Sequence, residues 1–362
     1  VQTCALPISG ENMNKLFTAA AILAVSSSLA FAGGHGMDSH SSHASAAKSG
    51  SGVHFFGRLY VGYDNKTTGA ADSIDNIRDN DGKSRLGIKF KENLGGMSLI
   101  GHAEWKFDIA DGTSGADSTT ACTGARDCRT FDLHVGNLGF LTSLGYIGIG
   151  SFESPYKLMG MYDSNMDTAL ALNSHGGTSD GAFGIASTWD SSVSYHGAMG
   201  PMEIAYMRGM ADDVGGSNAA NVAKGDYAFG LKLKDIMPGL EFGFARSHDK
   251  SGASNYGTSN DKFFASFKVM PNMGVFYTNE DLEIAGSNHG AGDITTMGTH
   301  YTMGNNMIQL VYASGNMDTA TTDYDTVSIS NQMNLSKSTN ITIGYTRKGI
   351  EGAGSAVRTY GP

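Results

Sequence analysis

VHFFGRLYVGYD, residues 53–64, alternates two kinds of side chain with a period of two. Successive side chains of a β-strand point to opposite faces, so this stretch predicts a strand with one apolar and one polar face. The apolar face carries Val53, Phe55, Leu59, Val61 and Tyr63, and the polar face carries His54, Phe56, Arg58, Tyr60 and Asp64.

The same two-sided pattern returns in SRLGIKFK, residues 84–91, and in MSLIGHAEWKFD, residues 97–108. In the first stretch, Leu86, Ile88 and Phe90 oppose Arg85, Lys89 and Lys91. In the second, the apolar residues Met97, Leu99, Ala103, Trp105 and Phe107 oppose the polar residues Ser98, His102, Glu104, Lys106 and Asp108. Each strand is therefore expected to face an apolar medium on one side and water on the other.

Sixteen segments of the chain carry such strand patterning. They lie near residues 53–64, 84–91, 97–108, 130–138, 145–152, 189–197, 201–209, 226–234, 239–247, 261–269, 273–279, 293–302, 306–314, 322–334, 339–348 and 354–362. Short turns such as ENLGG and MGNN alternate with longer polar connections at 65–83, 109–129, 153–188, 210–225, 248–260 and 280–292. Short turns at one end and long loops at the other are typical of an up-and-down transmembrane β-barrel.

A soluble β-sandwich also combines alternating strands with turns. It is disfavoured because the long loops here occupy every second connection, and because many strands approach the roughly 9 to 11 residues that cross a bilayer when tilted. After Ala32 no window approaches 18 consecutive apolar residues, which excludes transmembrane helices. Lipid cannot satisfy backbone polar groups, so strands in a membrane must close on themselves. We expect an all-β, sixteen-stranded antiparallel barrel over residues 53–362, wide enough for an aqueous channel.

The residues before the barrel divide into three parts. Residues 13–32 start with Met13 and Lys15, continue with an apolar run and end in Ala30-Phe31-Ala32, which predicts a secretory signal peptide cleaved after Ala32. Residues 1–12 precede Met13 and read as an upstream, non-native segment without predicted structure. Residues 33–52 are rich in Gly, Ser and His and predict a flexible tail.

Composition and motifs narrow the function. The formal net charge of −10 disfavours nucleic acid as a partner, because phosphate binding needs a basic surface. The sequence contains no serine-nucleophile, zinc-protease or phosphate-loop motif, so we expect no enzyme activity, cofactor or metal site. Cys122 and Cys128 lie in an exported chain, where a disulfide is the natural interpretation; the alternative is a metal pair, for which no nearby His completes a standard ligand set.

The chain from Val53 onward resembles the trimeric, sixteen-stranded general-diffusion porins of proteobacteria, of the neisserial type. VHFFGRLYVGYD resembles the first strand of that family, and SRLGIKFKENLGG resembles its second strand and turn. GYIGIGSFESPYK resembles the strand before the third loop, SSVSYHGAMGPMEIAY the strand pair after it, and NLSKST a late turn. The resemblance implies a homotrimeric pore in the Gram-negative outer membrane, in contact with membrane lipid and lipopolysaccharide. Such a pore passes small hydrophilic solutes and ions by passive diffusion.

The resemblance also implies that the third loop, residues 153–188, folds into the barrel and narrows it. Acidic loop residues would then face basic residues of the wall. The residues expected to line the pore or its constriction are Arg58, Tyr60, Arg85, Lys89, Lys91, His102, Glu104, Asp108, Glu153, Asp163 and Asp167. For each of them the alternative is an ordinary solvated charge or lumen side chain without special geometry.

The sequence departs from the family pattern at three places. Ser151 and Thr188 stand where the family often has arginine, and the chain ends at Pro362 where family members run on to a terminal aromatic residue, so the last strand is expected to be truncated. Two missing arginines and the negative net charge predict a weak preference for cations. A substrate-specific porin and an adhesin that presents long loops remain the alternative functions.

Overall fold

The computed structural model describes residues 2–4, 51–68, 74–78, 83–107, 109, 131–166, 168–178, 188–210, 224–248, 259–283, 291–318, 323–350 and 356–361. The strands in the first part of the chain are β1 (Gln2–Cys4), β2 (Gly52–Thr68), β3 (Ile74–Arg78), β4 (Ser84–Asn93), β5 (Ser98–Phe107), β6 (Asp132–Thr142), β7 (Gly145–Glu153), β8 (Thr188–Met199) and β9 (Met202–Gly209). The second part contributes β10 (Tyr227–Lys234), β11 (Leu240–His248), β12 (Ser259–Met270), β13 (Met273–Leu282), β14 (Gly292–Met303), β15 (Asn306–Met317), β16 (Tyr324–Asn334), β17 (Thr339–Ile350) and β18 (Ala356–Gly361).

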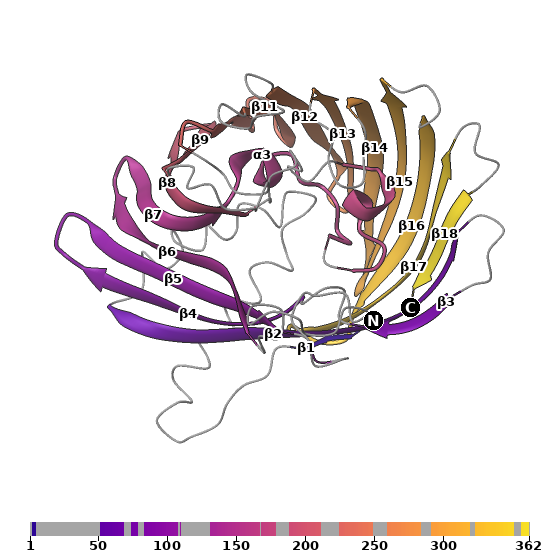
Figure 1. The fold of residues 1–362 in the computed structure, drawn as a ribbon, viewed down its shortest axis with the longest axis horizontal. Helices are drawn as coiled ribbons and strands as arrows, with labels where there is room; N and C mark the ends of the chain where they lie inside the picture. The colour runs from indigo at the N-terminus through magenta and orange to yellow at the C-terminus, as the bar shows by residue number, and fades with distance from the viewer. Residues whose placement is uncertain are drawn as a thin grey trace.

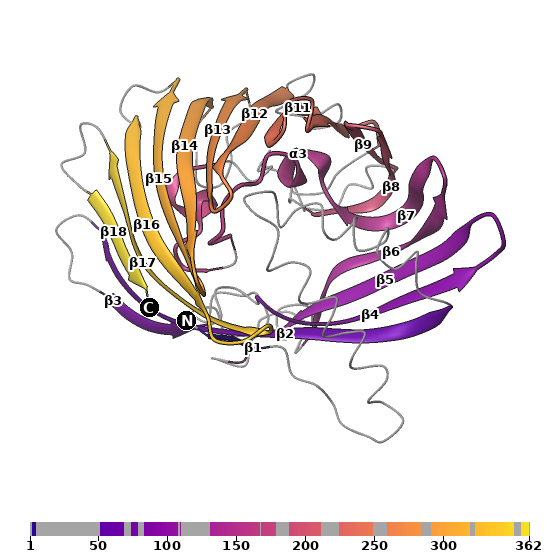
Figure 2. The same ribbon diagram turned by 180° about the vertical axis from the view of Figure 1, so that it is seen from behind.

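The long strands form one closed antiparallel ring. From β4 onward each strand pairs with the next along the chain, β2 pairs with β4, and β18 returns to pair with β2 at Asn65–Thr68. Figures 1 and 2 show these strands around an interior that contains a magenta segment of chain, including helix α3 (Pro155–Leu158). Closure leaves each strand with a partner on both sides, which satisfies the backbone groups that lipid cannot.

All sixteen predicted strands are present in the described residues, with ends that differ by a few residues. Two short strands were not predicted. β3 lies inside the expected connection 65–83, where it pairs with Gly62–Lys66 and lengthens the β2 hairpin. β1, within the stretch for which the sequence indicated no structure, pairs with Leu59–Val61 of β2 and Thr339–Ile341 of β17. Cleavage after Ala32, which stays a prediction, would remove β1, and closure of the ring would then depend on the pairing of β18 with β2.

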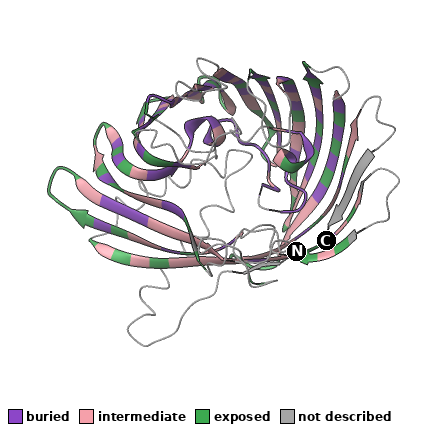
Figure 3. Ribbon diagram, viewed as in Figure 1, coloured by how far each residue is buried: buried purple, intermediate pink, exposed green. Residues whose placement is uncertain are grey.

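Side chains alternate between the two surfaces of the ring, as Figure 3 shows by the buried and exposed bands along the strands. Large apolar side chains point outward: Phe55, Leu310 and Ile329 are 54%, 48% and 48% exposed. Their inward-facing neighbours Gln309 and Ser330 are buried. Apolar side chains outside and polar side chains inside are the reverse of a soluble domain and match the alternation read from the sequence.

No helix in the described part of the chain is long and apolar enough to cross a membrane. The two helices that it contains are single turns, α3 and the 3-10 helix η1 (Leu172–His175). Both belong to the connection between β7 and β8, which supplies five of the ten residues in the main apolar cluster inside the ring.

Candidate functional site: the barrel interior and its inserted loop

The described residues of 154–178, with Asp167 left out, are called the inserted loop below. Local sequence shapes its first turn, because Ser154 caps α3 through a 3.2 Å hydrogen bond from the Lys157 N–H, and Pro155 suits the first helical position. Gly160 follows α3 with φ +70, and Gly176 follows η1 with φ +82. Both angles lie in the left-handed region that favours glycine, so the two glycines let the chain reverse after each short helix.

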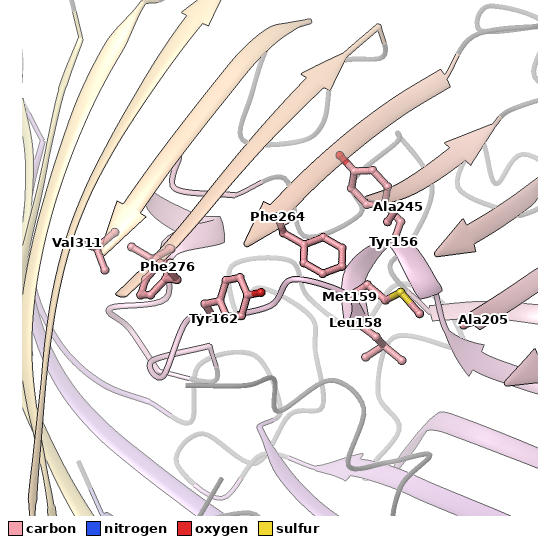
Figure 4. Close-up of a cluster of buried hydrophobic side chains, with 10 residues drawn as sticks. Tyr156, Leu158, Met159, Tyr162, Ala205, Ala245, Phe264, Phe276 and Val311 are labelled. Atoms are coloured by element: carbon pink, nitrogen blue, oxygen red, sulfur yellow. The ribbon is translucent and has the colours of Figure 1, made fainter. Parts of the chain in front are cut away.

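Apolar contacts hold the inserted loop against the wall formed by β9–β15. Figure 4 shows the cluster: Tyr156, Leu158, Met159 and Tyr162 of the loop lie among wall side chains. The buried wall members are Ala205 on β9, Ala245 on β11, Phe264 on β12, Phe276 on β13 and Val311 on β15. Burial of this cluster fixes the first half of the loop to one side of the barrel.

Polar contacts reinforce the same attachment. The Tyr156 hydroxyl donates a 2.8 Å hydrogen bond to the carboxylate of Glu280 on β13, which is fully buried, and the Thr178 hydroxyl donates to the same carboxylate at 2.5 Å. The Lys262 ammonium donates to the Tyr156 carbonyl oxygen at 2.9 Å. The Tyr162 hydroxyl donates to Glu241 at 3.0 Å, and burial together with this carboxylate raises the pKa of Tyr162 well above its usual value.

Asp163 organises the second half of the loop. Its carboxylate accepts hydrogen bonds from the backbone N–H groups of Asn165 (2.8 Å) and Leu172 (2.7 Å), and from the side-chain amide of Gln309 on β15 (3.3 Å). Asn165 in turn donates to the Ser330 hydroxyl on β16 at 3.0 Å. Asp163 is only 4% exposed, so its carboxylate lies between loop and wall and not toward the lumen, where the family resemblance placed it.

The end of the loop returns along β16 and β14. The Tyr324 hydroxyl donates to the Gly176 carbonyl oxygen at 2.8 Å, and the Thr326 hydroxyl donates to the His175 carbonyl oxygen at 2.5 Å. The Thr296 hydroxyl contacts the Gly177 carbonyl oxygen. These contacts of the inserted loop thus extend from β9 to β17, along one half of the inner wall.

The other half of the inner wall carries a charged cluster on β4, β5 and β6. The guanidinium of Arg85 donates to Glu104 at 2.6 Å and contacts the ring of His134, and the ring of His134 lies 2.8 Å from Glu104. His134 reaches this place through a β-bulge, because Leu133 pairs with Trp105 and Val135 pairs with Glu104, which leaves His134 as the extra residue. Bulges commonly re-aim a side chain in this way. We name Arg85, Glu104 and His134 the wall cluster.

The two positions where arginine was expected both contact His134. The Ser151 hydroxyl donates to the His134 carbonyl oxygen at 3.4 Å, and the Thr188 hydroxyl lies 3.5 Å from its ring. Glu153, next to Thr188 in the pairing of β7 with β8, accepts a 2.8 Å hydrogen bond from Lys157 of the loop. The start of the inserted loop therefore lies beside the wall cluster, where loop and opposite wall come together.

The remaining predicted pore residues fall into three groups. Arg58, Tyr60, Lys89, Lys91 and His102 are on the inner face of β2, β4 and β5; Arg58 donates to the Lys83 carbonyl oxygen at 3.1 Å, and Lys89 lies 5.1 Å above the ring of Phe56. Asp108, Asp167, Cys122 and Cys128 lie outside the described residues, so the predicted disulfide stays a prediction. Asp163 belongs to the contacts that attach the inserted loop to the wall.

The described residues contain no group of three or more His, Cys, Asp and Glu arranged to hold a metal.

A second charged group, on β8–β11, was not predicted from the sequence. Glu203 lies 2.9 Å from the ring of His196, 2.5 Å from the Lys234 ammonium and 3.4 Å from that of Lys232, and Lys232 lies 3.9 Å from Glu241. Pairing of β8, β9, β10 and β11 brings these side chains together from four strands, near the short turns. Alternation could have placed each on the inner face, but their grouping depends on register.

A closed antiparallel barrel with polar side chains inside, apolar side chains outside and a loop folded into its lumen defines a porin. The family model of Gram-negative porins matches residues 18–353 of this chain, and the chain belongs to that family. It is an outer-membrane diffusion channel and not an enzyme. A search of curated proteins finds no match.

Solved structures agree with this fold at low sequence identity. The anion-selective porin from Comamonas acidovorans is 16% identical with a TM-score of 0.59, over 86% of this chain and 98% of that one. The trimer form of OmpT, an outer-membrane protein of Vibrio cholerae, is 16% identical with a TM-score of 0.55 over the same shares. A triple mutant of the Rh. blastica porin is 13% identical with a TM-score of 0.51, again over 86% and 98%. These likenesses support the fold.

Proposed function

We propose that small hydrophilic solutes and ions pass between the inserted loop and the inner wall of β2 and β4–β6. The observation that carries this proposal is the one-sided attachment of the loop. Apart from the ion pair of Lys157 with Glu153 at the end of β7, the hydrogen bonds and apolar contacts given above for the loop go to β9–β17, whereas the wall cluster and the lysines of β4 and β5 lie on the opposite half. Solutes that cross the barrel then meet the charges of that half.

Cysteine scanning tests this route. Lys106 lies on the inner face of β5, and Ser330 lies behind the loop, where it accepts from Asn165. In single-channel recordings, a thiol-reactive cation applied to Lys106→Cys should change the conductance. The same reagent should leave Ser330→Cys unchanged. Reaction at Ser330→Cys with no effect at Lys106→Cys would place the route on the other side of the loop.

The charge of this route leads us to propose a weak preference for anions. On the inner faces of β2, β4 and β5, the basic residues Arg58, Arg85, Lys89, Lys91 and Lys106 outnumber the acidic residues Asp64 and Glu104. Carboxylates that contribute to the net charge of −10, among them Asp281, Asp293 and Asp325, are exposed on the outer face. The cation preference expected from the sequence rests on the net charge and the two missing arginines, and it stays a prediction. The charges of the wall beside the route dominate the ion selectivity, because salt screens more distant charges over about 8 Å at physiological ionic strength.

The assembly and surroundings of the barrel are also proposals. We propose a homotrimer embedded in lipid and lipopolysaccharide; the apolar outer face supports the lipid contact, and the trimeric OmpT structure supports the assembly. Mass measurement of the detergent-solubilised protein tests it, with three chains expected and one chain contradicting it. A saturable block of conductance by one solute would favour a substrate-specific porin. Cell binding that persists in a plugged variant would favour an adhesin.

A further inference from the structure

A row of three small residues lies on the inner wall under helix α3. Gly230 on β10 pairs with Ala205 on β9 and with Ala245 on β11, so the three are direct cross-strand neighbours on the inner face. All three are buried, and both alanines belong to the cluster that includes Met159 of the inserted loop. We call Ala205, Gly230 and Ala245 the seat.

Met159 fills the space above the central residue of the seat. A Cβ atom built on Gly230 would lie 2.3 Å from the Met159 Sδ, 3.0 Å from its Cγ and 3.1 Å from its Cε. Met159 itself is completely buried, and Figure 4 shows it beside Ala205 and Ala245. The thioether therefore occupies the volume that any side chain at position 230 would need.

Gly160, the residue after Met159, also lies close against the wall. Its φ of +70 suits glycine, and a Cβ there would lie 2.4 Å from Cγ and 2.5 Å from Cβ of Phe264, the adjacent wall residue on β12. Loop and wall thus approach closely because each carries a glycine, Gly160 or Gly230, where a side chain would clash with the other. Protein interiors pack too densely to absorb an added side chain without movement.

We propose that the seat, through Met159, sets how deeply the inserted loop lies against β9–β11 and thereby the width of the passage on its other side. These are positioning residues: they act through the loop and not by touching solute. The inference rests on the proposed route between the loop and the β4–β6 wall. A larger residue at position 230 pushes the loop into that route, and a smaller residue at 159 makes room for it.

Single-channel conductance of matched variants in planar bilayers tests the proposal. Gly230→Leu should show a loss of conductance, Gly230→Ala a smaller loss, and Met159→Ala in the Gly230→Leu background should restore conductance toward the wild-type value. Ser194→Leu is the matched control, because Ser194 is buried on the inner face of β8, outside the seat. Its conductance loss should not be recovered by Met159→Ala.

The outcomes separate the inference from the proposed function. Absence of any channel in the wild type would remove the proposed function itself. A conducting wild type in which Met159→Ala fails to recover Gly230→Leu, or recovers Ser194→Leu equally, would overturn the seat while leaving the pore intact. If Gly230→Leu does not assemble, Gly230→Ala and its Met159→Ala double variant decide: the pair must show the same loss and recovery.

Discussion

The carboxylate of Asp163 accepts a 2.7 Å hydrogen bond from the backbone N–H of Leu172, which ties together two parts of the inserted loop. A second backbone N–H, that of Asn165, binds the other carboxylate oxygen at 2.8 Å. Asp163→Asn keeps the size of the side chain but replaces one acceptor with a donor. Leaving a buried N–H without its acceptor costs about 1 to 3 kcal/mol.

We therefore expect Asp163→Asn to loosen the loop and raise current noise in the open channel, with the reversal potential under a KCl gradient unchanged. Single-channel recording measures both. A shifted reversal potential with unchanged noise would mean that Asp163 acts as a lumen charge, as the sequence suggested. Asp235→Asn, in the exposed turn between β10 and β11, is the control and should alter neither quantity.

Tyr156→Phe removes the 2.8 Å hydrogen bond from the loop to Glu280 and changes little else in shape. Since Glu280 is fully buried, the loss of a donor to its carboxylate should cost about 1 to 3 kcal/mol of loop attachment. We expect faster cleavage of the loop by an added protease while the barrel stays resistant. Cleavage at the wild-type rate would show that the contacts of Thr178 and Lys262 suffice without Tyr156.

Ile88 and Lys89 are neighbours on β4 that face opposite sides of the barrel. Arginine on the lipid face near the bilayer midplane costs about 2 to 4 kcal/mol, so Ile88→Arg should lower the free energy of unfolding in lipid by that amount. Lys89→Arg keeps an inward positive charge and should leave stability near the wild-type value. Urea titration of both variants in vesicles makes the comparison. Equal stability of the two would contradict the assignment of faces.

Lys106→Glu tests whether wall charge or net charge sets selectivity. Unit charges about 7 Å apart in water interact by about 0.6 kcal/mol, so reversal of one lumen charge should shift the permeability ratio a few-fold toward K⁺ at low salt. The shift should fade in molar salt. Arg347→Glu changes the net charge equally but lies exposed on the outer face of β17, and should leave the ratio unchanged. Equal shifts in both variants would favour the net-charge interpretation.

Strand positions were predictable because each barrel strand repeats one elementary pattern. In residues 53–64 the period of two alone separated Phe55, which is exposed, from Tyr60, which is buried. Conformations that break the period were not predictable. His134 reaches the wall cluster through a one-residue bulge, and nothing in its neighbours along the chain marks that shift.

The conformation of the inserted loop was also not predictable from the residues alone. Its expected entry into the barrel came from a family resemblance, and its acidic residues carried no signal of direction. Asp163 turns to backbone N–H groups because the loop folds back on itself, and its wall partner Gln309 lies 146 residues away in sequence. Contacts over such separations depend on the register of the whole ring.

A planar-bilayer recording of the purified wild-type protein tests the central claim most directly. An open, water-filled channel should give discrete conductance steps whose size rises in proportion to KCl concentration, and a reversal potential slightly on the anion side at low salt. Protein that inserts into the bilayer without conductance steps, or whose current saturates as salt rises, would contradict a passive diffusion pore.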